Sequence, residues 1–175
     1  SRESYLWRGR THLAMQNYGA ARSDFERALE FLPDEAAVYQ GLGITYLEMD
    51  EPEEAATNLR VAIERQPRQG QHYYWSGRTK LALDDYQAAL QDFSQAIDLL
   101  PPEESGDAYY WRGRLYFERE NYPLAAANMG QAIERGLELE DVREAYYWRG
   151  RAQFETQAFA EAVADLNQAI EQAPQ

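Results

Sequence analysis

The chain has 175 residues, enough for one ordinary domain, and contains no cysteine, which excludes disulfide bonds, thiolate metal sites and cysteine nucleophiles. Its net charge of -13 would repel nucleic acid phosphates and anionic membrane surfaces, so we expect no nucleic acid partner and no membrane partner. The sequence holds no run of eighteen apolar residues and no basic, apolar leader, and we therefore expect a cytoplasmic protein.

One short motif recurs along the whole chain. Residues 5–10 read YLWRGR, and close copies follow at 73–78, 109–114 and 146–151, with a divergent copy, YQGLGI, at 39–44. The copies share a glycine, which recurs at Gly9, Gly43, Gly77, Gly113 and Gly150. Successive glycines are 34, 34, 36 and 37 residues apart, and the extra residues of the last two joints fall in turn-forming sequence. A fixed period of this size predicts a tandem repeat architecture.

Each repeat predicts two helices. A first helix surrounds the glycine, a short polar turn follows, and a second helix ends near a proline in four of the five repeats. Asn17, Asp85 and Asn121 are expected N-caps of second helices, and Pro52 falls in a first turn, where its missing N–H costs little. No segment alternates with period two, so we expect no strand. The predicted repeats are residues 2–33, 36–67, 70–101, 106–137 and 143–174.

Small and large residues recur downstream of each glycine at fixed offsets. In the first repeat these are Ala21, Phe25, Ala28 and the closing Pro33. Together with the aromatic and glycine positions of the first helix, this pattern resembles that of the tetratricopeptide repeat family, over essentially the whole chain. The resemblance implies an all-α, right-handed superhelical solenoid of five helix-turn-helix pairs, about ten helices forming a single array over residues 1–175. It also implies a binding or scaffolding module and no enzyme.

The first helices carry two further recurring positions. In the resembling family the first helix of each pair lines a concave groove. The tryptophan row comprises every tryptophan of the protein, Trp7, Trp75, Trp111 and Trp148, and Gly41 interrupts it. The arginine row lies one helical turn further on and comprises Arg10, Arg78, Arg114 and Arg151, interrupted by Ile44. The same face is expected to present Tyr74, Tyr110, Tyr147, Phe117 and Phe154.

Two interpretations of these rows remain open. In the first, the rows form a groove that binds an extended or helical peptide, with aromatic rings supplying contact area and arginines holding acidic groups. In the second, each arginine simply stacks over the neighbouring tryptophan as surface structure. We expect the partner to be a protein or peptide segment with acidic or aromatic residues, and the chain to be one part of a larger protein.

Catalytic or metal chemistry is not expected. His12 and His72 lie in different repeats and at different helical positions, without metal-ligand spacing around either. The glycines lie inside predicted helices and so form no phosphate-binding loop. The acidic residues fall mainly on the second helices, Asp92 among them, which is typical of a solvated convex face. We expect no cofactor and no metal.

A third set of positions predicts ion pairs within repeats. Arginine precedes the glycine at Arg8, Arg112 and Arg149, and the facing positions of the second helices hold Asp24, Asn128 and Asp165. We expect Arg8 to pair with Asp24, Arg149 with Asp165, and Arg112 to form a hydrogen bond with Asn128.

The last predicted helix carries an apolar stripe that no later repeat covers in this chain. Its members, Phe159, Val163, Leu166 and Ile170, are spaced for one helical face. We expect either a longer parent protein or self-association through this C-terminal end face. A structural spacer or self-assembly unit that makes contacts through its end faces is therefore the alternative function.

Overall fold

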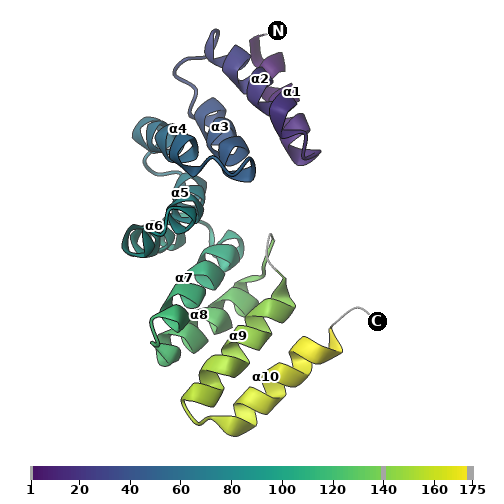
Figure 1. Ribbon diagram of the computed structural model, residues 1–175, viewed down its shortest axis with the longest axis vertical. Helices are drawn as coiled ribbons and strands as arrows, with labels where there is room; N and C mark the ends of the chain where they lie inside the picture. The colour runs from purple at the N-terminus through teal and green to yellow at the C-terminus, as the bar shows by residue number, and fades with distance from the viewer. Residues whose placement is uncertain (1, 139–140, 173–175) are drawn as a thin grey trace. The chain divides into compact units, whose positions relative to one another are not determined.

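A computed structural model describes residues 2–138 and 141–172, and this part of the chain folds into ten α-helices and one 3-10 turn without any strand (Figure 1). The all-α prediction and the ten helices are confirmed for these residues. The helices are α1 (Arg2–Ala14), α2 (Tyr18–Leu29), α3 (Ala36–Glu48), α4 (Pro52–Arg65), α5 (Gly70–Ala82), α6 (Tyr86–Leu99), α7 (Gly106–Glu118), α8 (Tyr122–Arg135), α9 (Val142–Glu155) and α10 (Phe159–Glu171).

The chain divides into two compact units, and the boundary lies between Asp92 and Phe93 inside α6. In the N-terminal unit, α1 to α5 pack each on the next, and α3 also contacts α1 and α5. In the C-terminal unit, α7 to α10 pack in the same consecutive way, and α7 also contacts α9. The first helices of neighbouring repeats therefore lie side by side within each unit.

The helices approach closely because small residues stand where they cross. Phe25 of α2 is fully buried, and its ring lies between the backbones of α1 and α3. A Cβ added at Gly9 would lie 2.9 Å from the Phe25 ring, and one added at Gly41 would lie 2.4 Å from Phe25 Cζ. A Cβ added at Gly43 would likewise lie 2.5 Å from Leu59 Cγ. These positions require glycine, because the distances are shorter than the contacts that Cβ atoms make in proteins.

The turn inside each repeat contains one residue in the left-handed conformation. The residue stands at the same place in all five repeats and has φ between 57° and 63°: Gln16, Asp50, Asp84, Glu120 and Gln157. None is a glycine, although glycine adopts this conformation without steric cost. The sequence pattern therefore predicts the turn, but the residue types in the turn do not reveal its left-handed backbone conformation.

The helix ends follow the predicted signals with one exception. The side chains of Asp85 and Asn121 accept hydrogen bonds from the N–H groups of Ala88 and Leu124, at 3.1 and 3.4 Å, as expected for N-caps. Asn17 holds the N-cap position of α2 as predicted, but its side chain makes no capping hydrogen bond. Pro52 begins α4 as predicted. Pro174 lies outside the described residues.

Candidate functional site

The predicted contacts within repeats are confirmed on the face that joins each helix pair. Arg8 donates from Nε and Nη2 to Asp24 at 2.7 and 2.5 Å. Arg149 contacts both oxygens of Asp165 at 2.6 Å. These bidentate pairs link the first helix of a repeat to the second. In the fourth repeat, Arg112 donates to the neutral Asn128 at 2.8 Å, also as predicted, and to Ser94 at 3.1 Å.

In the third repeat, different residues form the ion pair that links the first helix to the second. Ser76 stands where the first, fourth and fifth repeats have arginine, and Lys80, one helical turn later, contacts Asp92 at 2.6 Å. Asp92 is only 8% exposed. The prediction that Asp92 belongs to a solvated acidic face is therefore wrong, because this carboxylate is buried between two helices and neutralised by the lysine.

The Arg8–Asp24 pair predicts a pH dependence. The hydrogen bond from Arg8 lowers the pKa of Asp24 below its unfolded value of 3.8, against the effect of burial, which raises it. The stability from this pair is therefore complete above the unfolded pKa and is lost as the pH falls through the folded pKa. We expect Asp24→Asn to be less stable than wild type near neutral pH, with the difference in Tm shrinking below about pH 4.

Thermal melts of the two proteins across this pH range are the measurement. Asp98→Asn, which removes an exposed carboxylate from α6, is the control for net charge. A difference in Tm between wild type and Asp24→Asn that does not change with pH would contradict the assignment.

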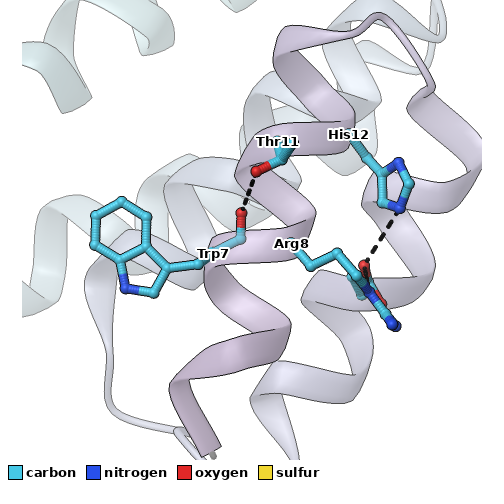
Figure 2. A network of polar contacts seen from close by, with 5 residues as sticks. Trp7, Arg8, Thr11 and His12 are labelled. Atoms are coloured by element: carbon cyan, nitrogen blue, oxygen red, sulfur yellow. Dashed lines mark hydrogen bonds and ion pairs between the residues drawn. The ribbon is translucent and has the colours of Figure 1, made fainter.

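The tryptophan row lies on another face of the first helices. Figure 2 shows Trp7 and His12 projecting from opposite sides of α1. His12 faces α2, where its Nε2 lies 3.8 Å from a carboxylate oxygen of Asp24. Trp7 points away from this contact and is 60% exposed. The ion pairs and the aromatic rings thus occupy separate surfaces of the same helix.

Each arginine of the arginine row stacks on the tryptophan of its own helix. The guanidinium carbon lies 4.9 Å from the ring centroid in the Arg10–Trp7 pair and 5.2 Å in the Arg151–Trp148 pair. The two remaining pairs, Arg78–Trp75 and Arg114–Trp111, have distances of 5.9 and 6.0 Å. The stacking interpretation is confirmed for all four pairs.

In the C-terminal unit the stacking continues from one repeat to the next. Arg114 of α7 lies 4.0 Å from the Trp148 ring of α9, and Arg151 of α9 lies 4.9 Å from the Phe117 ring of α7. The Phe117 and Trp148 rings meet edge to face at 5.0 Å, and Tyr147 meets Trp148 at 5.2 Å. Two cations and three rings therefore form one surface that spans both helices.

The row arginines differ from the other arginines in their partners. In the part of the chain that the structure describes, Arg10, Arg114 and Arg151 form no ion pair with a carboxylate, whereas Arg8 and Arg149 do. The Nε of Arg114 is buried and has no hydrogen-bond partner among these residues. Unneutralised positive charge in a protein of net charge -13 is therefore held on the tryptophan face.

The candidate residues differ in exposure. Tyr74 and Tyr110 are 2% and 3% exposed, so their rings belong to the core and offer a ligand no surface. Their hydroxyls accept hydrogen bonds from the Nη1 atoms of Arg78 and Arg114, at 3.2 and 3.3 Å. Trp7 and Phe154 are largely exposed, Tyr147 is 38% exposed, and Arg10 is exposed. The remaining candidates are half-buried: Trp75, Arg78, Trp111, Arg114, Phe117, Trp148 and Arg151.

A pocket in the N-terminal unit was not expected from the sequence. It has a volume of about 410 Å³ and lies where α3 interrupts both rows. The sequence contains an indication of this pocket, because Gly41 and Ile44 interrupt the tryptophan row and the arginine row in the same repeat. The pocket, called the Ile44 pocket below, is lined by Arg10, Leu13, Ala14, Gln16, Tyr18, Ile44, Glu48 and Trp75.

Among the described residues, no cluster of three or more histidine, aspartate or glutamate side chains is arranged to hold a metal. His72 is fully buried, and burial lowers its pKa. Within the same residues, no helix has the length and apolar character needed to cross a membrane.

Comparison with known families gives two matching models, both described as tetratricopeptide repeat. One matches residues 40–104, 77–129 and 110–175, and the other matches residues 2–68. Among curated proteins, no sequence matches the chain.

Solved structures show the same fold at low sequence identity. The crystal structure of MamA is 23% identical, with a TM-score of 0.78 over 93% of this chain and 92% of MamA. The pilF protein of Pseudomonas aeruginosa is 18% identical, with a TM-score of 0.87 over 99% of this chain and 77% of pilF. YrrB, described as a TPR protein with an unusual peptide-binding site, is 19% identical, with a TM-score of 0.73 over 98% of this chain and 86% of YrrB.

Proposed function

Because the chain belongs to the tetratricopeptide repeat family, whose members are generally non-catalytic interaction modules, we propose that its aromatic and arginine-lined face binds a peptide segment of a partner protein. The segment carries acidic residues, together with aromatic or other apolar ones. The single array over residues 1–175, which the sequence predicts, is part of this proposal. The proposal also includes the predicted groove residues, except the buried rings of Tyr74 and Tyr110.

The observation that carries the proposal is the set of arginines without acidic partners. Each lies over an aromatic ring, which holds the guanidinium in place without neutralising its charge. A carboxylate that binds there replaces water around a charge that the protein does not neutralise. YrrB, which shares the fold, is described as having a peptide-binding site, and this is consistent with a ligand on the present chain.

Selection from a phage library of random peptides tests the proposal. We expect the chain to enrich a short motif that contains acidic residues, and the enriched peptides to bind less tightly as salt is added. Enrichment of nothing, or of motifs that are indifferent to salt and free of acidic residues, would refute the proposal.

A second candidate function is self-assembly through the C-terminal end face. The observation that favours it is the exposure of Phe159, Val163 and Ile170 on α10, at 54%, 59% and 71%. A cavity of about 550 Å³ lies between α9 and α10 and is lined partly by Leu166 and Ile170. We expect sedimentation to show association that rises with concentration and that Leu166→Asp abolishes. A monomer at all concentrations, unaltered by this change, would remove the second candidate.

A further inference from the structure

The second repeat differs from the others on the face that carries the rows. Gly41 replaces tryptophan, and no side chain fits there because a Cβ would overlap the Phe25 ring at 2.4 Å. Ile44 replaces arginine one turn later. One large ring and one cation are therefore missing between Arg10 and Trp75, and the Ile44 pocket occupies this space.

The size and lining of the pocket suit a single side chain. Its volume of about 410 Å³ is near the lower end of the range for ligand pockets, about 300–1,000 Å³. Leu13, Ala14, Ile44 and the Trp75 ring provide apolar surface from α1, α3 and α5. An apolar side chain placed there would contact three helices and lose part of its exposure to water.

The charged groups of the pocket make it asymmetric. Arg10 is held over Trp7 at 4.9 Å and forms no ion pair in the described part of the chain. Glu48 accepts a hydrogen bond from the Tyr18 hydroxyl at 3.2 Å through one oxygen, and the side chain is exposed. A ligand carboxylate is therefore attracted to Arg10 and repelled by Glu48.

We propose that the Ile44 pocket binds a bulky apolar side chain of the partner peptide while an acidic group of the same segment binds Arg10. This inference rests on the proposed function and adds a chemical class for the ligand's anchor, an aromatic or branched aliphatic residue beside a carboxylate. The register of the peptide follows, because the second repeat is the one that has neither the tryptophan nor the arginine of the rows.

Small aromatic probes test the pocket directly. We expect 3-phenylpropionate to shift the NMR signals of the Ile44 methyl groups and of the Trp75 indole in a saturable way. Phenethylamine carries the same ring on a cation and should bind several-fold more weakly, since Arg10 repels it. The absence of a saturable shift at Ile44 with 3-phenylpropionate would overturn the proposal.

Ile44→Arg is the most informative variant, because arginine occupies this position in the other four repeats and is compatible with the helix. The longer side chain should fill the pocket and weaken 3-phenylpropionate at least about tenfold. Arg10→Gln should retain the pocket but lose the preference for 3-phenylpropionate over phenethylamine. Arg60→Gln, on the exposed face of α4, should change neither property.

Circular dichroism tests whether Ile44→Arg is folded. If this variant is unfolded, the ligand preference of Arg10→Gln decides whether the pocket proposal holds. Unchanged binding in Ile44→Arg, or an unchanged preference in Arg10→Gln, would overturn the proposal. The phage-selected peptides separate this inference from the proposed function. Peptides that need Arg114 and Arg151 but are indifferent to Ile44→Arg would refute the pocket and leave the proposed function standing.

Discussion

Gly41→Ala is expected to destabilise the protein, although alanine is the better helix former. The new methyl group would stand 2.4 Å from Phe25 Cζ, and the ring could move away only by displacing its neighbours, because it is fully buried in the core. Overpacking of this kind costs about 1–3 kcal/mol. The gain in helix propensity returns only about 0.5–1 kcal/mol, so the overlap decides the sign. Urea denaturation is the measurement.

Gly19→Ala is the matched control for helix propensity. A Cβ at Gly19, on α2, meets no atom within 4 Å, so this variant should gain about 0.5–1 kcal/mol of stability. Phe25→Leu, combined with Gly41→Ala, should cost less than the sum of the single changes, because the narrower side chain leaves room for the methyl group. Additive effects, or a Gly41→Ala variant as stable as wild type, would contradict the packing account.

The second large effect concerns ligand binding. Replacing Arg114 and Arg151 together by glutamine should weaken a phage-selected acidic peptide at least about tenfold, because each arginine offers charge-assisted hydrogen bonds to a carboxylate. The dependence of the affinity on salt should also decrease. The melting temperature should fall modestly, because the variant loses the stacking of Arg114 on Trp148 and of Arg151 on Phe117, worth about 0.5–1 kcal/mol each. Isothermal titration and thermal melts provide the two measurements.

A second double variant controls for net charge. The double variant Arg22→Gln, Arg60→Gln also removes two positive charges, but from α2 and α4, where these arginines pair with Glu26 and Glu64. The peptide affinity of this variant should remain close to that of wild type. Equal losses in both double variants would show that general electrostatics, and not the tryptophan face, govern binding.

Much of the fold could be predicted because the repeat multiplies each local signal. The same offsets recur five times, so helix pairs and turns are identified with little ambiguity. The pairs of Arg8 with Asp24 and of Arg149 with Asp165 were predictable because an aspartate stands sixteen residues after each of these arginines, at the facing position of the second helix. The stacking of each row arginine on its tryptophan followed from the spacing of one helical turn.

The sequence predicted the candidate site less completely. Tyr74 and Tyr110 adjoin the tryptophan row, but the sequence does not reveal how far each helix is rotated against its neighbours, and this rotation buries both rings. The Ile44 pocket depends on the Phe25 ring filling the space beside Gly41, a contact between two repeats. Local periodicity specifies helices well, but it does not specify such packing between helices.

The position of the tryptophans allows a direct test of peptide binding by this face. All four tryptophans of the protein belong to the tryptophan row, so their indole N–H signals report on that face and on no other. Titration with a phage-selected peptide, followed by ¹H–¹⁵N NMR, is the measurement. We predict that indole signals shift with the same midpoint as binding measured by calorimetry. Saturation of binding while all four indole signals stay unchanged would contradict the assignment of the binding face.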